Sequence, residues 1–91
     1  MAVAIQEVVE LIRQEARGKL PADTVIDGST KLEDLGLSSL QISEIVFTLE
    51  ERHEVEFDDA RAADIETLDD VVEVANQALA ARDAALGVEA G

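Results

Sequence analysis

Between a glycine-containing loop and a strongly helical segment the chain reads Asp34-Leu35-Gly36-Leu37-Ser38-Ser39-Leu40-Gln41. A hydroxyl at this place lies at the positive end of a helix, which favours a phosphate group. One of the two serines is therefore a candidate for phosphate chemistry. The alternative is that the pair only caps the helix, because serine is strongly preferred at helix N-termini.

The segment after the serine pair predicts a helix from about Ser39 to Arg52. Ser38 and Gln41 have the spacing of a capping box, with Ser38 as the N-cap. The core stripe of this helix is Ile42, Ile45, Val46 and Leu49. A second face carries Leu40, Glu44, Phe47 and Glu51. Apolar residues among acids on a surface suggest a partner contact, whereas the alternative is that Phe47 packs under the next loop.

A first helix is predicted from about Ala2 to Arg17. Its apolar stripe is Ile5, Val8, Val9, Ile12 and Ala16. Gly18 and Pro21 provide the stop signals. A long connection follows to Leu37, with apolar anchors at Leu20, Val25, Ile26, Leu32, Leu35 and Leu37. Within it, the capping-box spacing of Thr30-Lys31-Leu32-Glu33 predicts a short helical turn.

The second half of the chain predicts two more helices. A short one covers about Asp59 to Ala63, and Val55 and Phe57 before it alternate with acids like a strand but have no partner strand. The last helix follows an N-cap at Thr67, with Asp70 at its third position. The fold expected is all-α, a small three-to-four-helix bundle with a long loop between helices one and two. We expect one domain at residues 1–82 and a disordered tail at 83–91.

Composition excludes several classes of function. The chain has no cysteine and one histidine, so disulfides, thiolate metal sites and a cysteine nucleophile are absent. Twenty-one acidic and seven basic residues give a net charge of −14. That charge disfavours nucleic acid and anionic membrane surfaces and suits a partner with a basic surface. Without a signal peptide or a spanning segment, we expect a cytoplasmic, monomeric protein that is complete as it stands.

Three kinds of catalytic or metal site fit the sequence poorly. Residues 23–34 place acids like an EF-hand loop, but Val25 and Lys31 occupy ligand positions, so no metal site is expected. No acid pair shows a sign of burial that would shift its pKa. A Ser-His-Asp triad would need His53, which lies about 20 Å from Ser39 along a continuous helix. Ser39 then remains as a point of attachment that another enzyme would activate.

From about Lys31 to Val74 the chain resembles the acyl carrier protein family. The resemblance is carried by residues 32–40, by Glu44-Ile45-Val46-Phe47-Thr48-Leu49-Glu50-Glu51, by Glu56-Phe57 and by Ile65-Glu66-Thr67-Leu68. It implies that Ser39 carries a covalent 4′-phosphopantetheine, donated by coenzyme A, whose thiol holds acyl groups as thioesters. The protein would then have no catalytic activity of its own.

The same resemblance implies the partners and the residues that meet them. A phosphopantetheinyl transferase and acyl-loading and acyl-transferring enzymes with basic surfaces would be the partners. The docking residues would be Leu40, Glu44, Phe47, Glu50 and Glu51. The lining of the acyl pocket would be Val46, Leu49, Phe57, Ile65, Leu68 and Val72.

The chain departs from the family at two positions near the attachment site. Ser38 stands where the family has Asp, and Gln41 stands where an acid is frequent. Ser38 still caps the helix, but a carboxylate that partners contact is lost. The departure suggests a carrier dedicated to a specialised pathway. The alternatives are a peptidyl or aminoacyl carrier and an acidic interaction module that is not modified.

Overall fold

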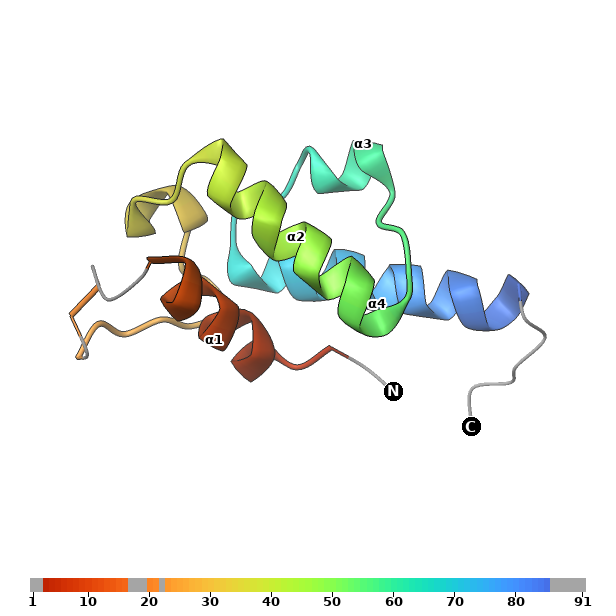
Figure 1. Ribbon diagram of the computed structural model, residues 1–91, viewed down its shortest axis with the longest axis horizontal. Helices are drawn as coiled ribbons and strands as arrows, with labels where there is room; N and C mark the ends of the chain where they lie inside the picture. The colour runs from red at the N-terminus through yellow and green to blue at the C-terminus, as the bar shows by residue number, and fades with distance from the viewer. Residues whose placement is uncertain (1–2, 17–19, 22, 86–91) are drawn as a thin grey trace.

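The computed structural model describes residues 3–16, 20–21 and 23–85. Within these ranges the elements are α1 (Ile5–Ala16), the 3₁₀ turn η1 (Leu32–Leu35), α2 (Ser39–His53), α3 (Asp59–Ala62) and α4 (Leu68–Ala85). Figure 1 shows α1 and α2 lying against α4, and α3 lies within the connection that leads from α2 to α4. The predicted all-α bundle with a long connection between its first two long helices is confirmed.

The core forms where α1, α2 and α4 meet. Its largest side chains with almost no exposed surface are Val8, Ile12, Leu49, Leu68 and Val71. Each such side chain stabilises the fold by roughly 1.5–3 kcal/mol relative to its exposed state. The periodicity of α1 predicted this face, but it missed Leu11, which is also buried. The predicted helix ends at Ala2 and Arg17, and the stop at Gly18, lie outside the described residues.

Two long helices begin at the predicted caps. The Oγ of Ser38 accepts a hydrogen bond from the backbone N–H of Gln41, and the Gln41 side chain accepts one from the Ser38 N–H. At the start of α4, the Thr67 hydroxyl and the Asp70 carboxylate make the same reciprocal pair with each other's backbone N–H groups. Because such boxes satisfy donors that the helix leaves free, they fix where each helix starts.

The connection between α1 and α2 contains the expected helical turn, with a different cap. Lys31 precedes η1 and makes no side-chain cap bond. The Thr30 hydroxyl instead bonds with Asp27. Gly36 ends the turn at φ 75°, a left-handed conformation that glycine adopts without steric cost. The prediction that Val25 anchors this loop is wrong, because 79% of its surface is exposed.

Backbone hydrogen bonds join the long connection to the segment before α4. The N–H of Leu32 donates to the carbonyl of Glu66 at 2.8 Å, and the N–H of Leu68 donates to the carbonyl of Thr30 at 3.3 Å. The N–H of Asp69 donates to the carbonyl of Gly28 at 2.9 Å. Lys31 and Thr67 therefore pair as an isolated antiparallel bridge. This bridge holds η1 beside the linker that leads into α4.

Helix α4 extends further along the chain than the predicted start of the tail allows. The helix continues to Ala85, so it includes the first three residues of the expected tail at 83–91. Arg82 is held in place, because its Nη1 donates to the carbonyl of His53 at 2.6 Å. A contact between the C-terminal turns of two helices is invisible to a local pattern, which explains the error. Residues 86–91 lie outside the described part of the chain.

Candidate functional site

The two serines at the start of α2 have different surroundings. Ser38 lies before the helix, and its hydroxyl accepts the capping hydrogen bond from Gln41 at 3.2 Å. Ser39 is the first residue of α2, is exposed, and is not the cap. The free backbone N–H groups of a first helical turn attract anions. Ser39 therefore combines an accessible hydroxyl with a place that favours a phosphate.

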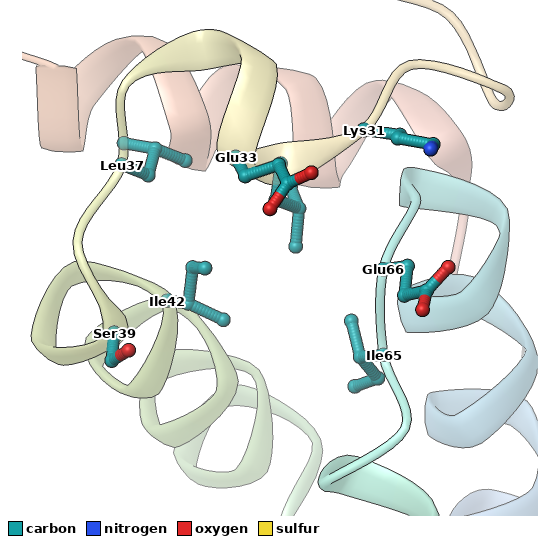
Figure 2. A pocket seen from close by; sticks show the side chains of 8 residues that line it. Lys31, Glu33, Leu37, Ser39, Ile42, Ile65 and Glu66 are labelled. Carbon is teal, nitrogen blue, oxygen red and sulfur yellow. The ribbon is translucent and has the colours of Figure 1, made fainter.

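A cavity of about 260 Å³ opens beside Ser39. Its lining consists of Lys31, Leu32, Glu33, Leu37, Ser39, Ile42, Ile65 and Glu66. Figure 2 shows Leu37, Ile42 and Ile65 directed into this space from three different segments, while the charged ends of Lys31 and Glu66 point away from it. Apolar and charged side chains therefore share the lining of this cavity.

The residues predicted to line an acyl pocket lie mostly elsewhere. Of that set, Ile65 is the member that lines the cavity beside Ser39. Leu49 and Leu68 have no exposed surface, and Phe57 is buried. Val46 and Val72 are half-buried against the core. The other apolar residues that line this cavity are Leu32, Leu37 and Ile42, which the periodicity and the loop pattern marked as core or anchor residues.

The predicted docking face of α2 is largely open to solvent. Leu40 is 69% exposed and Phe47 is 55% exposed. Glu44 and Glu51 are exposed on the same helix. Phe47 is therefore not packed under the next loop, and the alternative reading of this residue is excluded by the structure. An exposed aromatic and an exposed leucine among acids form a surface that could meet an apolar and basic partner.

Glu50 differs from the other predicted docking residues. It is half-buried, and its Oε2 accepts a hydrogen bond from the backbone N–H of Phe57 at 2.8 Å. That bond ties the segment after α2 back onto the helix. Val55 and Phe57 consequently point into the core without forming a strand, as predicted.

The two positions that depart from the family pattern are engaged within the bundle. The Ser38 hydroxyl serves the cap, and the Gln41 side chain accepts from the Ser38 N–H at 2.9 Å. The Gln41 Nε2 also donates to the carbonyl of Glu15 on α1 at 3.3 Å. Gln41 therefore bridges two helices. A carboxylate at this position could not make the contact with the Glu15 carbonyl, because it has no N–H to donate.

His53 lies at the other end of α2 from Ser39. Its Nε2 is 3.0 Å from a carboxylate oxygen of Glu7 on α1. Fourteen steps along a helix at ~1.5 Å each separate it from Ser39 by about 20 Å. The continuous helix therefore keeps His53 away from Ser39, and His53 contacts Glu7 on α1 instead.

Two aspartates near the bridge have carboxyl groups with lowered pKa values. The backbone N–H groups of Glu66 and Thr67 donate to Asp70 and hold its pKa below the usual value. The hydroxyl and N–H of Ser29, together with Thr30, lower the pKa of Asp27 in the same way. Hydrogen bonds to the charged form produce both shifts. These carboxylates fix the loop and the α4 N-terminus.

Comparisons with known proteins point to one family. A family model described as "Phosphopantetheine attachment site" matches residues 7–75 of this chain. An acyl carrier protein of Exiguobacterium sibiricum is 36% identical over 70 residues, covering 77% of this chain and 82% of that protein. Acyl carrier protein 3 of Ralstonia nicotianae is 38% identical over 64 residues, covering 70% of this chain and 74% of that protein.

A plant relative is similar over a smaller share of its own length. The chloroplastic acyl carrier protein 3 of Hordeum vulgare is 30% identical over 78 residues, covering 86% of this chain and 58% of that protein. This chain therefore spans less than two thirds of the barley protein.

The fold also has a solved counterpart. The solution structure of the acetyl actinorhodin acyl carrier protein from Streptomyces coelicolor matches with a TM-score of 0.73. The match covers 90% of this chain and 96% of that chain at 23% sequence identity. At this identity the similarity concerns the fold. Among the helices that the structure describes, none has the length and apolar character needed to cross a membrane.

Proposed function

Because the chain belongs to the acyl carrier protein family, whose members carry a covalent 4′-phosphopantetheine group, we propose that this group is attached to Ser39. The chain is a carrier, and partner enzymes of the family supply the catalysis. The assignment rests mainly on the different surroundings of the two serines. Ser38 uses its hydroxyl for the cap, and Ser39 presents an exposed hydroxyl at the first position of α2.

The surroundings of Ser39 fit such a group. The first turn of α2 offers backbone N–H groups to a phosphodiester, whose remaining charge they would favour. The cavity beside Ser39 gives the arm a place to lie. The arm supplies the thiol that holds the acyl group, and the chain itself has no cysteine.

Attachment is the work of a second enzyme, because among the described residues no basic side chain makes a hydrogen bond with the Ser39 hydroxyl. In the transfer from coenzyme A, the Ser39 Oγ–phosphorus bond forms as the phosphoanhydride P–O bond breaks. The nucleotide half of coenzyme A leaves as 3′,5′-ADP, and the Ser39 proton passes to a base of the phosphopantetheinyl transferase. His53 cannot take this proton, since it pairs with Glu7 at the other end of α2.

The cargo is an acyl thioester that serves fatty-acid, lipid or secondary-metabolite synthesis. Leu40, Glu44, Phe47 and Glu51 form the α2 docking face that meets basic partner enzymes, an assignment supported by their exposure and charge. Ser38 and Gln41 add no carboxylate next to Ser39, so an enzyme that relies on one there would engage poorly. This difference favours partners specialised for this carrier.

Intact mass measurement tests the attachment site. The apo protein is incubated with coenzyme A and a broad-specificity phosphopantetheinyl transferase. We expect the increment of one phosphopantetheine in the natural chain and in Ser38→Ala, and none in Ser39→Ala. An increment that persists in Ser39→Ala would move the site elsewhere. No increment in the natural chain with any transferase would favour an unmodified interaction module instead.

A further inference from the structure

Gln41 lies two residues after Ser39 at the start of α2, and both halves of its side-chain amide are engaged. Its Oε1 accepts from the backbone N–H of Ser38 at 2.9 Å, and its Nε2 donates to the carbonyl of Glu15 at 3.3 Å. The backbone N–H of Gln41 donates to the Ser38 Oγ at 3.2 Å. Gln41 therefore contacts both the residue before Ser39 and the end of another helix.

The position of the Ser39 side chain depends on the backbone of this turn. The reciprocal hydrogen bonds between Ser38 and Gln41 enclose Ser39 and fix both ends of the segment that contains it. Among the residues that the structure describes, none makes a hydrogen bond with the Ser39 hydroxyl. The direction in which the Ser39 side chain leaves the helix is therefore set through Ser38 and Gln41.

The same amide joins this turn to α1. Glu15 lies in the last turn of α1, where backbone carbonyls have no partner within the helix. Helices α1 and α2 also meet at their opposite ends, where Glu7 contacts His53 at 3.0 Å. The bond from Gln41 to Glu15 therefore ties the Ser39 end of the helix pair, and it limits the movement of the attachment turn away from α1.

Both contacts of the Gln41 side chain require an amide. The Ser38 N–H is a donor and the Glu15 carbonyl is an acceptor, and an amide offers the complement of each at once. Glutamate would keep the contact with Ser38, as in other capping boxes, and would lose the contact with Glu15. Because the Gln41 side chain is half-buried, water replaces a lost partner only in part.

We propose that Gln41 is a positioning residue for the transfer of phosphopantetheine to Ser39, and that it acts by holding the attachment turn against the end of α1. In that transfer the Ser39 Oγ–phosphorus bond forms as the phosphoanhydride P–O bond of coenzyme A breaks, and the proton passes to a base of the transferase. The attacking and leaving oxygens lie roughly in line, and a nucleophile misplaced by ~1 Å can cost about a hundredfold in rate. The inference rests on the proposed attachment at Ser39.

Steady-state kinetics of the transfer separates positioning from docking. The apo protein, over a range of concentrations, is incubated with coenzyme A and a broad-specificity phosphopantetheinyl transferase, and the rate is followed by intact mass. Gln41→Glu should lower kcat about tenfold and change KM by less than about twofold, because the α2 docking face is intact while Ser39 is misplaced. An unchanged or raised kcat, or a loss confined to KM, would overturn the proposal.

Two further variants separate the amide from the charge. Gln41→Met keeps the length and neutrality of the side chain and removes both of its contacts, so it should lower kcat at least as much as Gln41→Glu. Gln14→Glu is the matched control, because it adds the same charge at an exposed position of α1. It should leave kcat within about twofold of the natural chain. A loss in both glutamate variants and none in Gln41→Met would show that charge, rather than position, governs the transfer.

Amide hydrogen exchange of the apo protein checks the geometry without the transferase. Exchange at the Ser38 N–H should stay slow in Gln41→Glu and become faster in Gln41→Met, because only glutamate keeps an acceptor there. Exchange at the buried Val71 of α4 should be unchanged in both variants if they fold. If Gln41→Met also loses protection at Val71, the kcat of Gln41→Glu decides alone. Equal exchange at Ser38 in the natural chain and in a folded Gln41→Met would contradict the contact.

Intact mass separates this inference from the proposed function. A natural chain that gains no phosphopantetheine, or that still gains it in Ser39→Ala, overturns both proposals. A natural chain that is modified at Ser39 with the same kcat as Gln41→Glu and Gln41→Met remains a carrier, and only the role of Gln41 is then wrong.

Discussion

Ser38 and Ser39 have the same side chain, and one position along the helix axis decides what each hydroxyl does. The hydroxyl before the helix reaches the N–H of Gln41 and caps α2. The hydroxyl at the first helical position faces solvent. Sequence spacing alone predicted this cap, because a capping box depends only on residues within one turn. The attachment of phosphopantetheine to Ser39 remains a prediction for the mass measurement.

At the same scale, the charge of Glu44 should control how partners dock. Glu44→Lys should lower the rate of loading by a basic partner enzyme about tenfold at low salt, since steering by opposite charge is lost. The difference should shrink in ~0.15 M salt, where screening reduces the range of the field to ~8 Å. Initial rates of loading across a salt series give the measurement.

Glu10→Lys is the matched control for this charge reversal. Glu10 is an exposed acid on α1, so the net charge changes by the same amount away from the α2 docking face. Equal loss in both variants would show that the total charge, rather than this face, governs docking.

At the scale of the element, α2 ends in a strained residue. Glu54 adopts φ 54°, and the N–H groups of Glu54 and Val55 both donate to the carbonyl of Glu50. Glycine takes this conformation without the cost that a Cβ brings. Glu54→Gly should therefore raise the free energy of unfolding by about 1 kcal/mol in urea titration. Glu56→Gly, whose φ is not positive, should give no gain.

The start of α4 should carry part of the acid sensitivity. Asp70 has its pKa lowered below the usual 3.8, mainly by the N–H of Glu66 and then by that of Thr67. Its carboxylate thus stabilises the fold above the unfolded pKa, and this stabilisation is lost as the pH falls through the lower folded pKa. Asp70→Asn should cost about 0.3–1 kcal/mol at pH 7.

Urea titrations at two pH values measure this contribution. The difference between the natural chain and Asp70→Asn should narrow as the pH falls from 7 to 3, because the unfolded Asp70, with the usual pKa of 3.8, takes up a proton before the folded one does. Asp69→Asn is the control in the same turn, since the bonds from Glu66 and Thr67 go to Asp70. A constant difference across the pH range would contradict a role for the Asp70 charge.

At the scale of the whole molecule, the bundle is joined by contacts between distant segments. The bridge between Lys31 and Thr67 brings the long connection to the α4 linker and creates two walls of the cavity. Figure 1 shows these segments near the start of α2. At the opposite end, Arg82 joins the last turns of α4 and α2.

Arg82 should therefore contribute to global stability. Arg82→Ala removes a charged donor from the carbonyl of His53 and should lower the free energy of unfolding by about 1.5–3 kcal/mol. Thermal or urea unfolding gives the measurement. Arg61→Ala, at an exposed arginine of α3, should change it by no more than about 0.5 kcal/mol. Equal effects would mean that the contact with His53 carries no stability.

The sequence by itself determined the starts of α2 and α4, the apolar stripe of α1 and the family. These features depend on neighbours within a turn or two, as the stripe of α1 and the caps at Ser38 and Thr67 show. The exposure of Val25, the helical turn at Arg82 and the lining by Leu32, Leu37 and Ile42 were decided only by tertiary structure. Each depends on a segment distant in sequence, and periodicity shows that a residue is apolar but not which segment covers it.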